Sequence, residues 1–492
     1  MSYARYLTVV NTALKDIVLP EVQSGRAKDA ITNSIAALAG LAANLERMSP
    51  ELLATIDAAA LPPELSALIP VPSAPVAGVD PGIQLPMSNP AEDFSQNGEA
   101  MPLLKAGVAW LSTQPWPDDA AKKKSAKALL TWENAMRQDA MARANLSAQG
   151  IKSAGAGNVV PDVDAPMIER YLRKRYQSES IRVTDFKFLA GGRNRQTAMF
   201  TVSGTSEIPA KLVVQRDPPA ALNNLSGLGM QFAVLQLAHA GGMKVARPIL
   251  VEHGREALHA PFLITEQVGG ESPVPSMDYW ATPIKSDKLC ASLANQFAQM
   301  HRLPITRMEG VMVRYVDTAK GQTWMGDLIE LEKQWQDVSH APSMGITAAL
   351  AWLRAHVGCV DGTETIVHND ALFHNCLAEN EEVTAVLDWE MAHIGHPFED
   401  LGYVRPVVEQ MTDWPKFIDA YVAAGGNRPT QEQVDFFTLR SQLKLLILVM
   451  YARNAFDGGI TSELNMAEVG ASFLPKLIER ITSQLNGILQ QE

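Results

Sequence analysis

The chain has 492 residues, of which 47% are hydrophobic and 20% are charged, and its formal net charge at pH 7 is −12. This length predicts roughly two to four structural units, and the composition is typical of a globular protein. The acidic balance argues against general nucleic-acid binding, which requires a basic face.

Local sequence patterns argue against a membrane protein and against a secreted protein. The longest apolar run, Leu445–Ala452, has eight residues, far fewer than the roughly 20 that a membrane helix needs. The first 20 residues carry Lys15 and Asp16 within their apolar pattern, unlike the hydrophobic region of a signal peptide. The three cysteines lack paired or metal-ligand spacing, which fits a reducing compartment. We therefore expect a cytoplasmic protein with neither nucleic-acid nor membrane partners.

Residues 1–150 have the pattern of a separate helical module. Apolar residues recur at helical spacing over Ala4–Val18, Ala27–Arg47 and Asp118–Ala148. Residues 61–105 are rich in Pro, Ser and Gly and predict a long extended connection. No group of residues in the module indicates chemistry, so we expect packing and a candidate surface for a protein partner or for self-association.

Residues 160–268 predict a small region rich in β-strands. A helix over Asp164–Tyr176 precedes it. The expected strands, each rich in β-branched or aromatic residues, are Ile181–Leu189, Thr197–Val202, Leu212–Arg216, Val245–Val251 and Pro261–Val268. The Gly191-Gly192 pair between the first two strands is typical of a hairpin turn.

Residues 269–492 become mainly helical. Leu289, Leu293, Phe297 and Met300 form one apolar stripe of a helix that begins at Asp287. The later helices that we expect from helical spacing are Trp324–Gln336, Ile346–Val357, Trp414–Ala424, Gln431–Phe456 and Met466–Gln491.

Polar residues that could bind a metal ion or take part in catalysis cluster after two short strands of this region. Thr365–Val367 leads into a loop that contains Asp370 and Asn375, and Val383–Leu387 ends on Asp388. Carboxylate and amide oxygens are ligands that suit Mg²⁺, and phosphoryl transfer needs a further carboxylate to orient the attacking hydroxyl. The alternative is ordinary turn chemistry, because Asn and Asp are common at strand ends.

The pattern His368-x-Asp370-x4-Asn375, followed by a strand that ends in Asp388-Trp389-Glu390, resembles the catalytic core of a known family. It is similar to the aminoglycoside phosphotransferase and choline kinase-like family, relatives of the protein kinases. The PFEDLGY segment and the Pro-Pro after LVVQRD are most similar to the subgroup of kinase domains associated with acyl-CoA dehydrogenases.

The resemblance implies an α+β fold of the two-lobed, protein-kinase-like type. A small antiparallel β lobe would span residues 160–268 and a large, mostly helical lobe residues 269–492. The helical module of residues 1–150 would precede them.

The resemblance also implies roles for single residues. Asp370 would be the catalytic base or hydroxyl-orienting residue, and His368 would hold its loop in place. Asn375 and Asp388 would be the Mg²⁺ ligands. Asp400 matches the acidic residue that braces the catalytic loop from the next helix.

A nucleotide site follows from the same resemblance. The glycine-containing hairpin would cover the phosphates, since glycines let backbone N–H groups approach an anion closely, and the backbone of the last small-lobe strand would meet the base. The residues so assigned are Gly191, Gly192, Arg193 and Asn194 of the hairpin and Glu266, Gln267 and Val268 of the strand.

Three positions depart from the family pattern. Gln215 stands where a Lys or Arg would hold the α/β-phosphates, with Arg216 one residue later, and Gln231 stands where a Glu would orient that cation. Adjacent strand residues point to opposite faces, so Arg216 substitutes only through a register shift or bulge. Asn369 replaces a Gly, but Asn tolerates left-handed backbone geometry.

We therefore predict an ATP- and Mg²⁺-dependent phosphotransferase that acts on a hydroxyl group of a small molecule. A hydroxylated metabolite, a hydroxyacyl compound and an antibiotic are all compatible acceptors, and we rank the aminoglycoside below the hydroxylated acyl or xenobiotic compound. The alternatives are a pseudokinase that serves as a nucleotide-binding or scaffold protein, and a phosphotransferase that uses GTP.

Overall fold

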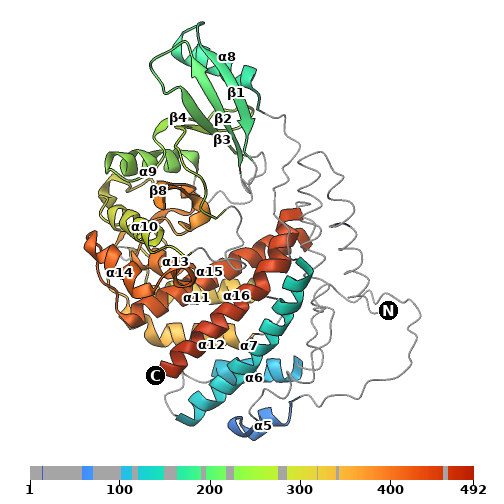
Figure 1. The fold of residues 1–492 in the computed structure, drawn as a ribbon. Helices are drawn as coiled ribbons and strands as arrows, with labels where there is room; N and C mark the ends of the chain where they lie inside the picture. Colours follow the sequence, from blue (N-terminus) through green and yellow to red (C-terminus); the bar gives the residue numbers. More distant parts are fainter. Residues whose placement is uncertain are drawn as a thin grey trace, which may run out of the picture. The chain divides into compact units, whose positions relative to one another are not determined.

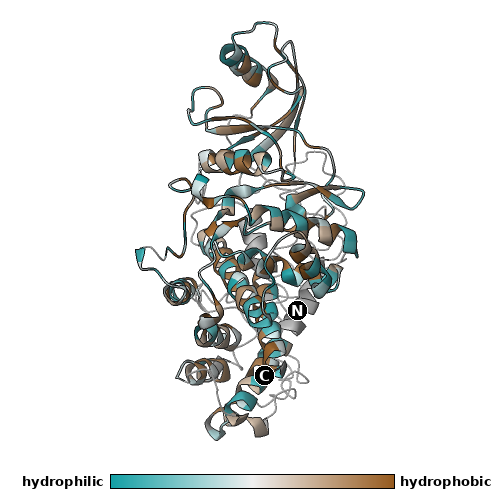
Figure 2. Ribbon diagram, turned by 90° about the vertical axis from the view of Figure 1, so that its left-hand side faces the viewer, coloured by the Kyte–Doolittle hydropathy of each residue, from teal (hydrophilic) through white to brown (hydrophobic). Residues whose placement is uncertain are grey.

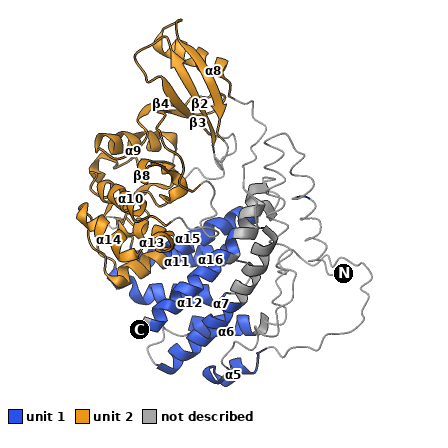
Figure 3. Cartoon of the chain, in the orientation of Figure 1, with its two compact units in different colours: residues 1–156, 323–359, 439–492 blue, residues 157–322, 360–438 orange. Residues whose placement is uncertain are grey.

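The computed structural model describes residue 14 and residues 58–69, 101–113, 120–148, 163–189, 195–217, 227–274, 285–317, 320–339, 343–457 and 464–491. The helices expected over Ala4–Val18 and Ala27–Arg47 and the hairpin residues Gly191–Asn194 lie outside these ranges. The chain divides into two compact units (Figure 3). Unit 1 comprises residues 1–156, 323–359 and 439–492, and unit 2 comprises residues 157–322 and 360–438.

Unit 2 contains a five-stranded antiparallel sheet with the strand order β1-β2-β3-β5-β4 (Figure 1). Its strands are β1 (Arg182–Phe188), β2 (Gln196–Ser203), β3 (Lys211–Arg216), β4 (Pro248–Glu252) and β5 (Phe262–Glu266). The expectation of an antiparallel β lobe is confirmed. All five predicted strands are present, although the fourth begins at Pro248 rather than Val245.

Helix α8 (Ala165–Tyr176) packs against one face of this sheet. It begins where the Asp164 side chain accepts a 2.8 Å hydrogen bond from the Met167 N–H, as an N-cap residue does. Ile168 and Leu172 on its inner face are fully buried with Phe200 and Leu212 of the sheet. Figure 2 shows hydrophobic residues along much of the strands, and both hydrophilic and hydrophobic residues along the helix that covers them.

The rest of unit 2 is mostly helical and carries two small antiparallel sheets. Strand β6 pairs with β9, and β7 pairs with β8. The predicted stripe on α10 is buried, and this helix packs against α14. The elements are α9 (Leu228–Ala240), α10 (Asp287–Met300), β6 (Thr365–Val367), η6 (Phe373–Asn375), β7 (Cys376–Glu379), β8 (Glu382–Val386), η7 (Trp389–Met391), β9 (His393–Gly395), α13 (Phe398–Met411) and α14 (Trp414–Ala423). Helix α15 (Gln431–Asp457) runs across the boundary of the two units.

Unit 1 is helical in its described residues. Helix α7 packs against α16, and α6 packs against α12. A carboxylate of α7 caps α12, because Glu133 accepts hydrogen bonds from the Ser343 hydroxyl at 2.8 Å and the Gly345 N–H at 2.6 Å. The elements are α5 (Pro63–Ser66), α6 (Met101–Thr113), α7 (Ala120–Ala148), α11 (Trp324–Val338), α12 (Met344–His356) and α16 (Leu464–Gln491).

The structure changes one expectation for this region. Residues 61–105 were predicted to form an extended connection, but they include α5 and the start of α6, where Leu103 and Leu104 are buried. Helices of the first 150 residues also share a core with helices that sequence patterns assigned to the large lobe. The boundaries of a module at 1–150 and lobes at 160–268 and 269–492 stay a prediction.

Within the described ranges, every helix is too short or too polar to cross a membrane.

Gly402 allows α13 and α15 to approach closely. A Cβ atom at this position would lie 2.4 Å from the carbonyl carbon of Phe437 and 2.6 Å from the amide nitrogen of Thr438. Because backbone atoms cannot move aside as a side chain does, we expect Gly402→Ala to lower the free energy of unfolding by about 2 kcal/mol or more, measured by urea denaturation. Gly362→Ala is the matched control, since its Cβ would meet nothing within 4 Å; equal losses in both variants would contradict this packing argument.

Candidate active site

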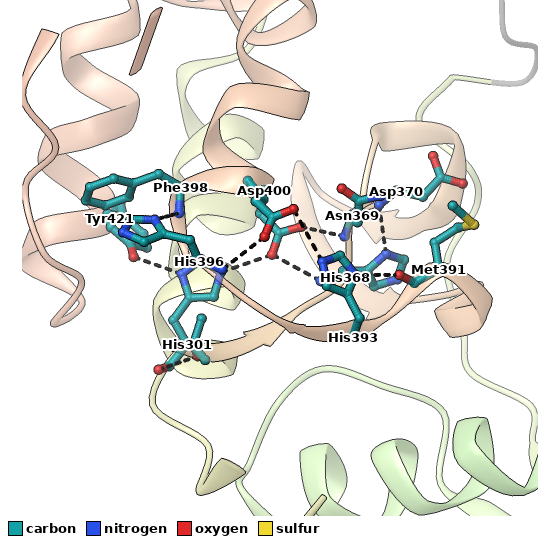
Figure 4. Close-up of polar contacts among 12 residues, drawn as sticks. His301, His368, Asn369, Asp370, Met391, His393, His396, Phe398, Asp400 and Tyr421 are labelled. Atoms are coloured by element: carbon teal, nitrogen blue, oxygen red, sulfur yellow. Dashed lines mark hydrogen bonds and ion pairs between the residues drawn. The ribbon is translucent and has the colours of Figure 1, made fainter. Parts of the chain in front are cut away.

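The loop that follows β6 is held by one buried carboxylate. Asp400 of α13 accepts hydrogen bonds from the backbone N–H groups of His368 at 3.1 Å and Asn369 at 2.6 Å. Its Oδ2 atom also lies 3.0 Å from Nε2 of His301, the residue that ends α10, and His301 is hydrogen-bonded to Tyr421 at 2.8 Å. Figure 4 shows Asp400 between His301 and the loop. The brace predicted from the next helix is therefore in place geometrically.

Asn369 adopts the left-handed backbone conformation, with a φ of 61°. A glycine reaches this region without strain, and Asn is one of the few other residues that enters it readily. The departure from the family pattern at this position is therefore compatible with the loop geometry.

His368 connects the loop to the end of β8. Its Nε2 atom lies 2.8 Å from the Leu387 carbonyl, to which it donates, and its Nδ1 atom accepts from the Asp370 N–H at 3.3 Å. Its ring contacts the Trp389 ring at a centroid distance of 4.7 Å. Burial lowers the pKa of His368, so the neutral ring that these two contacts require is favoured. His368 is thus built to position Asp370.

Asp370 is oriented by two side chains. Nδ2 of Asn375 donates to its Oδ2 atom and to its backbone carbonyl, both at 3.0 Å, and the Tyr403 hydroxyl donates to Oδ1 at 2.6 Å. Burial raises the pKa of Asp370 to about 7; the Tyr403 hydrogen bond opposes the shift, and the charge of Asp388 adds to it. A carboxylate with such a pKa can accept a proton near neutral pH.

Asn375 and Asp388 offer oxygen ligands of the kind that Mg²⁺ takes. Because Nδ2 of Asn375 is engaged with Asp370, the Oδ1 atom of the amide is directed elsewhere. Burial and the neighbouring Glu390 raise the pKa of Asp388, while the charge of Arg195 lowers it. A cation would offset this concentration of buried negative charge, so the residues present fit a divalent metal ion.

The few protein ligands at this site fit a metal ion that would be bound jointly with nucleotide phosphates. Across the described ranges, no group of three or more His, Cys, Asp or Glu side chains has the arrangement of a metal site. Mg²⁺ typically takes one or two protein carboxylates and completes its octahedron with water and substrate phosphates. Asp388 with Asn375 corresponds to that minimal set.

The residues predicted for the nucleotide fall into three groups. The Gly191–Asn194 hairpin lies outside the described residues. In the hinge strand, the N–H groups of Glu266 and Gln267 donate to the carbonyls of Arg247 and Lys211, so of the three N–H groups predicted to meet the base, that of Val268 is the remaining candidate donor. The hinge assignment stays a prediction.

On β3, Arg216 and Gln215 lie on opposite faces of the strand. Arg216 is 1% exposed, and its Nη1 atom donates to the Leu258 carbonyl at 2.8 Å. Gln215 lies on the other face, where it is half-buried. The strand has no register shift against β2 or β5, so Arg216 does not reach the position of Gln215 through a bulge.

The structure adds residues that sequence patterns missed. Tyr403 lies one helical turn after Asp400 on α13, and this i, i+3 spacing was a signal that could have placed it beside the loop. Arg195 contacts Gln231 and Asp217. Its partners are far away in the sequence, so no local pattern indicated it.

Comparisons with known proteins agree with this geometry. Residues 185–437 match the profile of the phosphotransferase enzyme family, and the chain belongs to this family. It is 25% identical to human acyl-CoA dehydrogenase family member 11 over 202 residues, which cover 39% of this chain and 24% of that protein. The mouse protein of the same name is 25% identical over 253 residues, which cover 49% of this chain and 31% of that protein.

The fold is also that of a solved structure. A putative aminoglycoside phosphotransferase from Ralstonia eutropha matches with a TM-score of 0.50 and 16% identity, over 65% of this chain and 98% of that chain. The family resemblance inferred from the motif between His368 and Glu390 is confirmed, and so is the α+β fold class. The matched part spans about a quarter to a third of the curated acyl-CoA dehydrogenase relatives named above.

Asp400→Asn tests the brace. An amide has one acceptor oxygen, and its NH₂ group would face a backbone N–H, so we expect the free energy of unfolding to fall by about 2–3 kcal/mol. Asp419→Asn is the control, because Asp419 is 65% exposed in its ion pair with Arg428 and should cost less than about 1 kcal/mol. Urea denaturation measures both. A loss at position 400 no larger than that at position 419 would contradict the brace.

Asp370→Asn tests the raised pKa of Asp370, in protein kept free of metal by a chelator. The folded-state pKa of about 7 exceeds the ordinary value of 3.8, so the folded state binds the extra proton between these values and wild-type stability falls as pH rises through this window. Relative to Asp370→Asn, the wild type should lose roughly 2–3 kcal/mol between pH 5 and pH 8. Urea denaturation at several pH values measures the difference, and a difference independent of pH would refute the shift.

Proposed function

We propose that this protein is a phosphotransferase that transfers the γ-phosphoryl group of ATP to a hydroxyl group of a small molecule, with Mg²⁺ as the metal. The carrying observation is that Asp370, Asn375 and Asp388 meet around one braced loop, with Asp370 directly hydrogen-bonded to Asn375. Membership of the phosphotransferase enzyme family supports the reaction class.

Asp370 would orient the acceptor hydroxyl and take its proton. As the acceptor oxygen bonds to the γ-phosphorus, the bond from that phosphorus to the β–γ bridging oxygen breaks and the nucleoside diphosphate leaves. A pKa of about 7 lets Asp370 receive the proton near neutral pH. Tyr403, which donates to Oδ1 of Asp370, would fix the direction in which the other lone pairs face. Bound Mg²⁺ would neutralise phosphate charge, held by Asn375 and Asp388.

The acceptor class is proposed from similarity. The similarity to acyl-CoA dehydrogenase family members favours a hydroxylated acyl compound over an aminoglycoside, in keeping with the PFEDLGY motif. ATP is the first nucleotide to test, and GTP is measured beside it.

The variants Asp370→Ala and Asp388→Ala separate activation of the acceptor hydroxyl from binding of the metal ion. Asp370→Ala should lower turnover by about 10³-fold while nucleotide affinity changes little, because the residue acts on the acceptor. Asp388→Ala should abolish the Mg²⁺ dependence of nucleotide binding, because it removes the charged metal ligand. Calorimetry with ATP and GTP, with and without Mg²⁺, measures binding, and the formation of nucleoside diphosphate and phosphorylated product with hydroxylated acyl compounds measures turnover.

Two outcomes would overturn the proposal. Full turnover in both variants would remove these residues from the site. Failure of the wild-type protein to bind either nucleotide would favour the pseudokinase alternative, in which the chain serves as a scaffold.

A further inference from the structure

Arg195 stands at a junction of three elements of unit 2. It directly precedes β2, and its side chain is 11% exposed. Nε donates to Oδ1 of Asp217, just after β3, at 2.8 Å, and Nη1 donates to Oε1 of Gln231 in α9 at 2.8 Å. Nη2 lies 3.7 Å from a carboxylate oxygen of Glu390 in η7, which is beyond hydrogen-bond distance.

The strand register places Arg195 on the face of the sheet that carries Gln215. In the pairing of β2 with β3, Thr197 is opposite Gln215 and Gln196 is opposite Arg216. The same register continued by one residue sets Arg195 opposite Asp217, and residues two apart share a face. Arg216 points to the other face, toward the core beneath α8. Arg195 therefore places a positive charge on the face of the sheet where β3 carries the neutral side chain of Gln215.

The contacts of Arg195 also explain why position 231 carries a glutamine rather than a glutamate. The Oε1 atom of Gln231 accepts from Arg195, while its Nε2 atom is buried without a hydrogen-bond partner among the described residues. Gln231 therefore orients the guanidinium as a neutral group. A glutamate here would compete for the positive charge, whereas an amide holds the geometry and leaves the charge available.

The Nη2 atom of Arg195 is directed toward the side of the site that carries the proposed metal ligand Asp388. Two of the three guanidinium nitrogens are engaged with Asp217 and Gln231, and the third, Nη2, faces the segment of Asp388 and Glu390. Glu390 lies two residues after Asp388, so Nη2 borders the segment that would hold the metal ion, and guanidinium groups pair strongly with phosphate oxygens.

We propose that Arg195 is the cation that binds the nucleotide phosphates in this protein, held in place by Asp217 and Gln231, and that it replaces the basic residue expected at position 215. The inference rests on the proposed nucleotide-dependent function. It adds a specific prediction: the positive charge has moved to the neighbouring strand, and the two glutamines are its counterpart rather than a sign of lost binding.

Calorimetry on the full chain with Mg²⁺ tests it, using the triphosphate, the diphosphate and the corresponding nucleoside. Arg195→Gln should weaken the triphosphate and diphosphate by about tenfold or more, while the nucleoside changes little, because only the phosphates contact the guanidinium. Arg195→Lys should keep part of the affinity, since it keeps the charge without the planar fork. Arg428→Gln removes the same charge from an exposed ion pair with Asp419 and should leave all three affinities unchanged.

A rescue variant separates binding from a structural role. In Arg195→Gln combined with Gln215→Lys, the new ammonium group lies on the same face of the sheet, so triphosphate affinity should return at least in part. A thermal-unfolding measurement accompanies each variant. If Arg195→Gln loses both stability and triphosphate affinity, and the rescue variant does not regain triphosphate affinity, Arg195 is a structural residue and the proposal is wrong.

The remaining outcomes are also decisive. Unchanged triphosphate affinity in Arg195→Gln, or an equal loss for the nucleoside, would overturn the role of Arg195 while the proposed function stands. Failure of the wild-type protein to bind any nucleotide would overturn both.

Discussion

The loop that follows β6 depends on the buried carboxylate of Asp400. It accepts two backbone N–H groups of the loop and contacts His301, and at 1% exposure it has almost no access to water. A buried carboxylate is tolerated only when its lone pairs are satisfied, so these contacts constrain α10, α13 and the loop to a single arrangement. That arrangement sets the direction of His368 and, through it, of Asp370.

Around this fixed loop the protein concentrates negative charge. Asp370, Asp388 and Glu390 lie close enough to influence one another, and burial raises the pKa of the first two. Such a cluster is unfavourable in the absence of a cation and becomes favourable when a divalent ion and a basic side chain are present. The folding free energy given up here is consistent with a site built to bind charged ligands.

A positive charge lies beside this cluster at a position that the family pattern does not predict. The resemblance predicts a basic residue on β3 paired with an acid on the following helix, and both positions are glutamines, Gln215 and Gln231. In the structure, Arg195, directly before the neighbouring strand β2, contacts Gln231. The electrostatic requirement of a phosphate site can thus be met from a different strand of the same sheet, since neighbouring strands lie only about 5 Å apart.

Sequence by itself predicted the strands and helices of the described kinase-like region and the motif from His368 to Asp388, because helical and strand periodicity and short motif spacings are local properties. It also gave the family, through His368, Asp370, Asn375 and Asp388. The brace by Asp400 was inferred from the family resemblance. Only the tertiary structure decided that Arg195 joins Asp217 and Gln231, which are 22 and 36 residues away in the chain. It also decided that helices from both ends of the chain share the core of unit 1. Such pairings depend on how strands and helices register in space, and no local pattern encodes that.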